Sequence, residues 1–255
     1  MSEGSKVDRI NDTFRQRILD GEYGKAGRLP SLRMLAQQYD TTHETMNKVI
    51  QRLQAEGLLM SLGRAGIFIH PSRTRIPGLT KRFDLYLLKL GLTPEEIDLE
   101  EPSIVAASAE VASVFDIEED APVVRRYRRQ GTTTHHYRLA KNFYPVELVG
   151  GEILEKMKQD VHFDVLAAIR ATHQKDVIRV RDDVVGRLPT SQEQELLQIV
   201  RNTPVLEVLR ITYGADEGGK DESEMAIMFS QIIFVANFFL LSYEYTPYWE
   251  NKWDI

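Results

Sequence analysis

Apolar residues recur every three or four positions in the first part of the chain, the spacing that gathers them on one face of a helix. This spacing predicts a first helix over residues 6–20, with a buried stripe of Val7, Ile10, Phe14 and Ile18. A second helix is expected to begin after Ser31, because a serine hydroxyl suits an N-cap. Its buried face consists of Leu32, Leu35 and Ala36.

A third helix is predicted after a turn at residues 40–42, with Thr42 as its N-cap and Gly57 at its end. Its buried stripe consists of Met46, Val49, Ile50 and Leu53. Short apolar runs at 58–60 and 67–69 flank a glycine-containing turn, which predicts two paired strands. Two short helices, a tight turn and a strand pair are typical of a winged helix-turn-helix, a module that places one helix in the DNA major groove.

Residues 71–80 contain two prolines and a glycine and few apolar residues, which is typical of a linker. Beyond them, helical patterns are expected near 83–90, 105–115, 152–158, 163–172 and 190–200. Strand patterns are expected near 123–130, 137–144, 177–185, 206–213, 225–234 and 238–244. The chain is therefore predicted to be an α+β protein, with a winged helix-turn-helix at 1–70, a linker at 71–80 and a mostly antiparallel sheet domain at 81–255.

The charges divide the chain near the same place. Residues 1–75 hold 12 Lys and Arg against 8 Asp and Glu, whereas the remainder holds 20 against 30. A basic N-terminal part on an acidic body fits a DNA-binding module fused to a domain with another task. Taken without the motif, the same asymmetry could be chance clustering.

Composition narrows the possible classes of protein. The chain has no cysteine, which excludes disulfides, cysteine-ligated zinc and cysteine nucleophiles. No run approaches the ~18 apolar residues of a membrane span, and the polar first residues lack a signal-peptide core, so a cytoplasmic protein is expected. The sequence contains neither a P-loop nor a nucleophile elbow nor a zinc-protease helix motif, and no cofactor is expected.

Three segments of the N-terminal part form a pattern: LPSLRMLA at 29–36, the threonines spaced T-x-x-T at 42–45, and RLQAEGLL at 52–59. Together they resemble the GntR family of bacterial transcription regulators. The body resembles the UTRA effector domain of the family's HutC-type branch. Its matching segments are APVVRRYRR at 121–129, NFYPVEL at 142–148, and VVGRLPTSQEQELLQIVRNTPVLEVLRITY at 184–213.

The resemblance implies an antiparallel sheet with flanking helices, similar to the chorismate lyase fold, around a pocket for a small-molecule effector. It also implies a homodimer that binds a palindromic operator in double-stranded DNA and changes its DNA affinity when effector binds. The expected function is therefore a ligand-responsive transcription regulator, most simply a repressor.

The candidate DNA-binding residues lie on the second helix, at the front of the third helix, and in the wing. They are Arg33, Thr42, His43, Thr45, Asn47, Lys48, Arg64 and Gly66. Asn47 suits adenine, and Lys48 suits guanine or phosphate. Family members often carry arginine at the position of His43, and histidine cannot make arginine's bidentate contact with guanine. The plainer alternatives are solvated side chains and, for the threonines, helix capping.

The candidate effector-binding residues are Arg82, Phe83, Arg126, Arg128, Arg138 and Glu224. Alternate residues of a strand share a face, so Arg126 and Arg128 are expected on one side of their strand and Tyr127 on the other. The resemblance implies that arginines of this strand hold an anionic group, and these two are assigned to the pocket. A surface ladder that balances acidic residues is the alternative.

Two positions depart from the family's pocket pattern. Ala140 or Lys141 stands where relatives often carry a glutamate, and Phe238 stands where they often carry an arginine. These departures favour an effector more apolar than a phosphosugar, or a chain that has lost its response. The adjacent His135 and His136 would point apart on a strand, so no metal site is expected.

Two other functions stay open. The chain could be a constitutive DNA-binding repressor whose C-terminal domain only dimerises. It could also be an enzyme, since the resembled body fold hosts a lyase, although no paired acid and base stands out in the sequence. The family's other large branch, with an all-helical and metal-binding effector domain, does not fit the strand-rich segments at 123–144 and 205–244.

Overall fold

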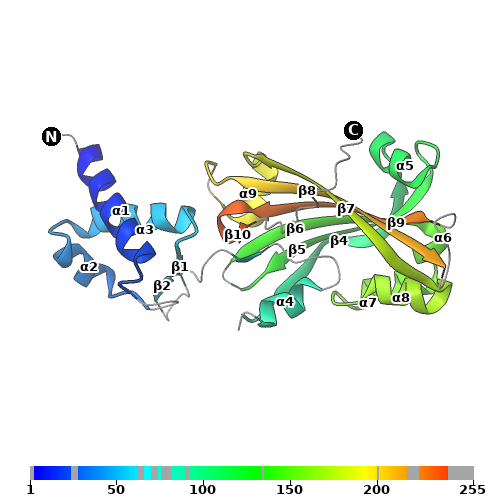
Figure 1. Cartoon of the computed structure of the whole chain (residues 1–255), viewed down its shortest axis with the longest axis horizontal. Helices are drawn as coiled ribbons and strands as arrows, with labels where there is room; N and C mark the ends of the chain where they lie inside the picture. Colours follow the sequence, from blue (N-terminus) through cyan, green and yellow to red (C-terminus); the bar gives the residue numbers. More distant parts are fainter. Residues whose placement is uncertain are drawn as a thin grey trace, which may run out of the picture.

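The computed structural model describes residues 3–23, 28–61, 66–69, 74–75, 82–89, 92–133, 135–199, 201–216 and 224–240. These residues form a small helical domain at one end of the molecule and a larger domain built on one sheet at the other (Figure 1). The predicted α+β class, with a winged helix-turn-helix before an antiparallel-sheet domain, is confirmed. None of the helices described is long and apolar enough to cross a membrane.

The N-terminal domain contains three helices and a two-stranded wing. They are α1 (Glu3–Leu19), α2 (Leu32–Gln38), α3 (His43–Ala55), β1 (Leu59–Ser61) and β2 (Ile67–Ile69). Both predicted N-caps are present, because the Ser31 hydroxyl accepts a hydrogen bond from the Met34 N–H and the Thr42 hydroxyl accepts one from the Thr45 N–H. The predicted apolar stripes meet in one core around the fully buried Phe14.

The C-terminal domain is built on a six-stranded sheet in the order β4-β5-β6-β9-β8-β7, in which every neighbouring pair is antiparallel. Its strands are β4 (Glu95–Ala106), β5 (Pro122–Gly131), β6 (His136–Pro145), β7 (Lys175–Arg187), β8 (Val205–Asp216) and β9 (Met225–Val235). The helices are α4 (Phe83–Lys89), α5 (Ala109–Phe115), α6 (Val146–Val149), α7 (Glu152–Gln159), α8 (Val165–His173) and α9 (Ser191–Leu197).

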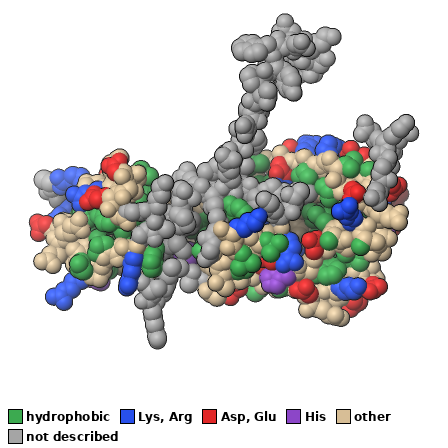
Figure 2. Space-filling model, turned by 60° about the horizontal axis from the view of Figure 1, so that its bottom comes forward, with side chains coloured by type: hydrophobic (Ala, Val, Ile, Leu, Met, Phe, Trp, Pro, Cys, Tyr) green, Lys and Arg blue, Asp and Glu red, His purple; other side chains and the backbone are tan. Residues whose placement is uncertain are grey.

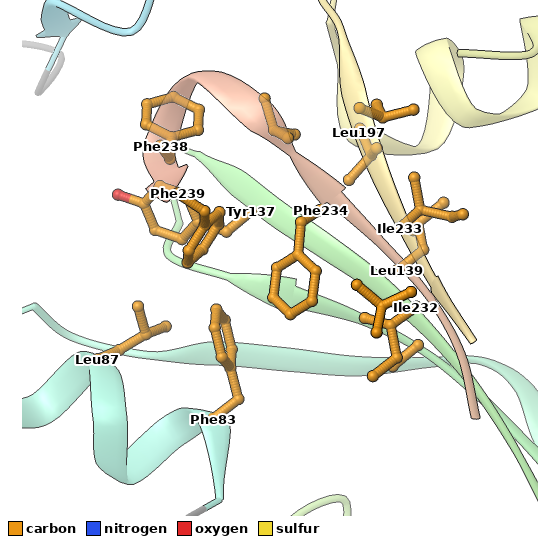
Figure 3. Close-up of a cluster of buried hydrophobic side chains, with 14 residues drawn as sticks. Phe83, Leu87, Tyr137, Leu139, Leu197, Ile232, Ile233, Phe234, Phe238 and Phe239 are labelled. Carbon is orange, nitrogen blue, oxygen red and sulfur yellow. The ribbon is translucent and has the colours of Figure 1, made fainter. Parts of the chain in front are cut away.

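Helices cover both faces of this sheet (Figure 1). Phe83 and Leu87 of α4 approach from one side, and Leu197 of α9 approaches from the other (Figure 3). Helices α7 and α8 lie on the α4 side, where they pack against Tyr144 and Met228, while α5 packs against Phe143 on the α9 side. Because side chains alternate along β6 and β9, these strands contribute an apolar layer to each face of the sheet. One of these layers faces α4, α7 and α8.

Several segments of the C-terminal domain differ from the prediction. Strand β4 and helix α6 were not predicted, and the helix expected from residue 105 begins only at Ala109. Helix α9 ends at Leu197 because Gln198 adopts a left-handed conformation with φ 54°. The strand expected at 238–244 begins one residue later, after the 3-10 helix η3 (Ala236–Phe238), and its residues 241–244 lie outside the described residues.

The predicted linker is tied to the C-terminal domain where the structure describes it. Strand β3 (Thr74–Arg75) pairs in parallel with β10 (Phe239–Leu240), which directly follows η3. The rest of the predicted 71–80 linker lies outside the described residues. Residues 74–75 of the connection between the two domains therefore lie beside the end of the β9–η3–β10 segment.

Candidate DNA-binding surface and effector cavity

Helix α3 separates its side chains into a buried and an exposed face. Met46 and Val49 are fully buried in the domain core, whereas His43, Asn47 and Lys48 are exposed. Lys48 forms an ion pair with Glu44 one turn earlier, at 3.2 Å, and its side chain stays half-exposed. The structure thus brings three of the predicted DNA-contacting side chains together on one open helix face, the arrangement that reading base edges requires.

The two candidate threonines at the start of α3 form the helix cap. The Thr42 hydroxyl accepts from the Thr45 N–H at 3.1 Å and donates to the Thr45 hydroxyl at 3.0 Å. This geometry satisfies one of the backbone donors that a helix leaves free at its N-terminus. Thr42 is exposed, so capping leaves its contact with phosphate as a prediction.

Arg33 is exposed on α2, and a second arginine, which was not predicted, lies beside the wing. Arg28 is exposed and pairs through its backbone with Phe68 of β2. Its guanidinium lies so near Gly66, which has φ +107°, that a Cβ atom on this glycine would stand 3.1 Å from Arg28 Nε. Arg28 has no sequence signal as a wing residue, because only folding places it there. The predicted Arg64 lies outside the described residues.

Basic side chains are visible over the N-terminal domain in Figure 2 together with acidic ones, and the two signs are also mixed over the larger domain. The predicted division of charge therefore does not appear as a separation on this face. The excess of 12 Lys and Arg over 8 Asp and Glu in residues 1–75 still favours approach of this part of the chain to duplex DNA, a dense array of negative charge.

A cavity of about 440 Å³ lies between the sheet and helices α4 and α8. Its apolar lining includes Phe83, Ala140, Phe163, Met228 and Ile232. Its polar lining includes Arg82, Asp84, Glu96, Arg128, Gln130, Arg138, Asn142, His162, Arg210 and Ser230. The cavity thus combines an apolar wall with many hydrogen-bonding groups, as small-molecule sites commonly do.

Four of the six predicted effector residues line this cavity: Arg82, Phe83, Arg128 and Arg138. Arg126 shares a strand face with Arg128 as expected, but it is not among the residues that line the cavity. Its side chain is fully buried, donates to both carboxylate oxygens of Asp98 at 2.8 and 2.9 Å, and donates to the carbonyl of Asp160. Glu224 is not on the cavity wall either, and it pairs with Arg179.

The arginines of β5 hold the loop that follows α7. Arg126 binds the Asp160 carbonyl, and Arg128 donates to the Val161 carbonyl at 3.2 Å as well as to Glu96 at 3.2 Å. Strand β4 supplies both carboxylate partners, since Asp98 lies on it beside Glu96. The predicted pair therefore has a structural role that a single strand pattern could not reveal.

Arg210 of β8 is a cavity residue that the sequence analysis missed. It donates from Nε and Nη2 to the two carboxylate oxygens of Asp182 on β7, both at 2.6 Å. Arg82 is held in a similar way, by both carboxylate oxygens of Asp84. The only signal of Arg210 in the sequence is its position in the predicted strand VLEVLRITY, where it alternates with apolar residues.

Asp84, Glu96 and His162 form a small cluster in the cavity. His162 Nδ1 lies 3.6 Å from Asp84 Oδ2 and 3.8 Å from Glu96 Oε2. Burial raises the pKa of Asp84, but hydrogen bonds, above all from Arg82, outweigh it and hold the pKa below its usual value. The three groups could offer ligand atoms to a cation. Such a cation would compete with Arg82 and Arg128, which already bind these carboxylates.

His135 and His136 lie where the chain returns from β5 into β6. His135 stacks on Tyr137 with ring centroids 6.3 Å apart. Burial lowers the pKa of both imidazoles, so the neutral form is favoured.

Comparison with known families accounts for both regions. Residues 6–69 match the model for bacterial regulatory proteins of the gntR family, and residues 95–219 match the UTRA domain. The chain belongs to the GntR family. The order of its two domains is that of the HutC-type branch, and it is a transcriptional regulator with a DNA-binding domain and an effector domain.

Relatives of similar length support this assignment. The chain is 24% identical to the HTH-type transcriptional regulator SCO4628 of Streptomyces coelicolor, over 83% of this chain and 84% of that protein. It is 24% identical to the HTH-type transcriptional repressor NagR of Bacillus subtilis, over 80% and 83% of the two chains. The crystal structure of PhnF from Mycobacterium smegmatis superposes with a TM-score of 0.59 at 20% identity, over 93% of this chain and 100% of that one. SCO4628 and NagR are named as a transcriptional regulator and a transcriptional repressor, and the structural match with PhnF shows the shared fold.

Proposed function

We propose that this GntR-family regulator is a dimeric repressor that binds a palindromic operator and changes its operator affinity when a small molecule occupies the cavity. Each protomer would place α3 in a major groove, and the two-fold axis of the dimer would set the spacing of the half-sites. Such a protein acts where the bacterial chromosome lies, in the cytoplasm. The similar NagR is named a repressor, which supports the sign of the response.

The observation that carries this proposal is a continuous segment between the two sites. Strand β9 contributes Ser230 and Ile232 to the cavity wall and runs on through η3 into β10. Asn237 in η3 lies against Gly57, at the end of α3. Strand β10 pairs with β3, in the connection between the domains. A shift of β9 on ligand binding would thus act on α3 and on the connecting segment together.

The response follows from the relative populations of two placements of the DNA-binding domain. An effector that binds one placement better than the other shifts the equilibrium toward it, by no more than its differential affinity. A coupling free energy of about 1–3 kcal/mol between two sites is typical, and it corresponds to roughly a 5- to 150-fold change in operator affinity. The effect on DNA is therefore expected to be graded, with residual binding in the disfavoured state.

Strand β7 offers a surface for the second protomer. It is the last strand of the sheet, and one of its two edges pairs with β8 while the other has no strand partner among the described residues. Apolar side chains on it are exposed, among them Val177, Ile178, Val180 and Val185. A long edge strand with exposed apolar residues is a template for pairing with another chain. A second copy of the protein fits the two-fold symmetry that a palindromic operator requires.

Fluorescence anisotropy of the full-length protein on its own upstream intergenic DNA tests the proposal, with scrambled DNA of equal length as control. Tight binding that prefers the upstream DNA and weakens with salt is expected. Equal and weak binding to both DNAs, at two salt concentrations and with or without small molecules, would contradict it. Selective binding that no small molecule changes would leave a constitutive repressor whose C-terminal domain only dimerises.

A further inference from the structure

Arg138 differs from the other arginines on the cavity wall. Arg82, Arg128, Arg170 and Arg210 each form a salt bridge with a carboxylate. Arg138 forms none with any residue that the structure describes; its Nε donates to the side-chain oxygen of Gln130 at 2.7 Å. Among the described residues, Arg138 therefore has only a neutral acceptor, the side-chain amide of Gln130.

The carboxylate nearest to Arg138 in this network is already shared. Gln130 donates to Glu96 Oε1 at 2.5 Å, and Glu96 Oε2 accepts from Arg128 at 3.2 Å. Glu96 thus compensates Arg128 directly and reaches Arg138 only through an amide. Two guanidinium groups with one carboxylate between them leave the equivalent of one positive charge uncompensated on this wall.

Packing directs the free part of Arg138 toward the cavity. Its guanidinium carbon lies 4.0 Å from the centroid of the Phe83 ring and 5.5 Å from that of Phe234. Stacking on aromatic rings uses the flat face of a guanidinium and leaves its N–H groups along the edge available. The two terminal nitrogens donate to no acceptor among the described residues, and Arg138 lines the cavity.

The electrostatics of this position call for an anion. Burial is the largest influence on Arg138 and lowers its pKa to about 9, with Glu96 offsetting part of the effect. The neighbouring charges of Arg128 and Arg210 lower the pKa further. A negative group against the terminal nitrogens would favour the charged guanidinium and reverse this shift.

Ala140 leaves room for such a group. Residues 138, 140 and 142 lie two apart on β6 and therefore share one face of this strand, and all three line the cavity. Ala140 pairs with Arg128 on β5 and with Ile232 on β9, so the space above its methyl group is bordered by a cation on one side and an apolar side chain on the other. A longer acidic side chain here could have paired with Arg138 internally, and alanine does not.

We propose that the cavity binds a small organic carboxylate, whose carboxylate group accepts from the terminal nitrogens of Arg138 above Ala140 and whose apolar part lies along Ile232 and Met228. This inference rests on the proposed effector role of the cavity and adds the chemical class of the ligand. It also places the anion on β6, not on the β5 arginines, which have internal carboxylate partners.

Two features favour a carboxylate over a phosphate ester. The two terminal nitrogens of one guanidinium match the two oxygens of a carboxylate, and a single uncompensated charge balances a single negative charge. A dianionic phosphate commonly uses a helix N-terminus as well. The N-terminus of α8 in the cavity wall is occupied by its own cap, since Asp164 accepts from the Ala167 N–H at 3.0 Å.

Thermal unfolding of the full-length protein with phenylacetate and hexanoate as probes tests the inference, and phenylacetamide and phenyl phosphate serve as comparison ligands. The carboxylates are expected to raise the melting temperature in a saturable way. R138Q should raise the half-saturating concentration of the carboxylates by about tenfold or more, because it removes a charge-assisted bidentate contact. K141Q is the matched control, because Lys141 lies on the same strand with its charge over Tyr127.

A second variant keeps the test informative if R138Q is poorly folded. A140E leaves Arg138 in place and supplies an internal carboxylate, so it should melt higher without ligand and lose the response to carboxylates. The inference is overturned if no carboxylate stabilises the wild-type protein, if phenylacetamide or phenyl phosphate stabilises it as well as phenylacetate, or if both variants respond as the wild type does. Operator binding measured in parallel separates the two proposals: stabilisation by carboxylate with unchanged DNA affinity would reject the effector role and keep the ligand class.

Discussion

Gly57 of the DNA-binding domain and Asn237 of the effector domain meet backbone to backbone. A Cβ atom at position 57 would stand 2.5 Å from the Asn237 carbonyl oxygen and 2.6 Å from the Asn237 Cβ, so only glycine fits. Gly57 has φ +71° and follows Glu56, the C-cap of α3, while Asn237 lies in η3, at the end of a strand that lines the cavity. The effector domain therefore touches the DNA-binding domain at the C-terminal end of its recognition helix.

Substituting Gly57 with alanine should disturb this contact and the response to ligand. G57A meets two penalties: a left-handed backbone, about 1–2 kcal/mol for a residue with a Cβ, and a clash with Asn237. Gly21 provides a matched control, because it has φ +78° and nothing within 4 Å of a Cβ. Urea unfolding of G57A and G21A gives the difference due to the clash, and operator titration shows whether DNA affinity changes with it. Equal stability and equal DNA binding of the two variants would reject a role for the contact.

Alanine substitutions on the exposed face of α3 should separate base reading from electrostatic attraction. N47A is expected to lose about 1–3 kcal/mol of binding to the operator and little to scrambled DNA, because an amide contact to a base edge is sequence-specific. R33A should weaken binding to both DNAs and reduce the salt dependence by about one counterion. Anisotropy titrations at several salt concentrations measure both effects. K89A, which removes an exposed cation of α4 in the other domain, should change neither.

A related prediction concerns the wing. R28A should weaken DNA binding as R33A does, because Arg28 is exposed beside Gly66. The same titrations measure it. Wild-type affinity and wild-type salt dependence in R28A would remove this residue from the DNA-binding surface.

The elements that the sequence predicted best are those whose burial follows a regular period. Helix α3 buries Met46, Val49 and Leu53, and its N-cap is a threonine with a matching backbone donor. Strand β9 is a nearly continuous apolar run, as a strand covered on both faces should be. Such elements show in the sequence because hydrophobic burial alone decides them.

Strand β4 escaped prediction because charge, not hydrophobicity, holds its inner face. Glu96 and Asp98 bind arginines of β5, so this face of the segment EEIDLEE is charged, and only Ile97 and Leu99 give it an apolar alternation, too short to predict a strand of twelve residues. Register shifts on both sides of Glu100 interrupt the alternation further. The same pairing explains why Arg126 could not be placed from its own strand: its carboxylate partner lies 28 residues away in an acidic segment.

Charged substitutions on β7 should separate the protomers if this strand forms the dimer contact. The double variant I178K/V185K places lysines on the exposed strand, a known means of preventing pairing of sheet edges. Light scattering coupled to size exclusion should show the wild-type protein as a dimer and the variant as a monomer at micromolar concentration. L19K is the control, because Leu19 is an exposed leucine at the end of α1. A variant that stays dimeric would place the interface elsewhere.

The buried hydroxyl of Tyr137 predicts a stabilising substitution. This oxygen has no hydrogen-bond partner among the described residues, and the ring packs between Phe238, at 5.0 Å, and Phe239, at 6.2 Å (Figure 3). A buried hydroxyl without a partner costs about 1–3 kcal/mol. Y137F keeps the ring and should therefore raise the free energy of unfolding at pH 7 by about 1 kcal/mol, as measured by urea unfolding.

Tyr137 also sets how the difference in the free energy of unfolding between Y137F and the wild-type protein changes with pH. Burial raises the pKa of Tyr137 to about 12 in the folded protein, while the unfolded chain loses this proton near the usual pKa of 10. Between these values the folded state binds more protons than the unfolded state, so the stability of the wild-type protein falls as the pH rises. Y137F lacks this loss, and its advantage should grow by about 1 kcal/mol between pH 10 and 11 and stay constant between pH 7 and 9. An advantage that does not change up to pH 11 would mean that the hydroxyl is hydrated in solution, and that α4, β6 and the β9–η3–β10 segment pack less closely around it than the structure shows.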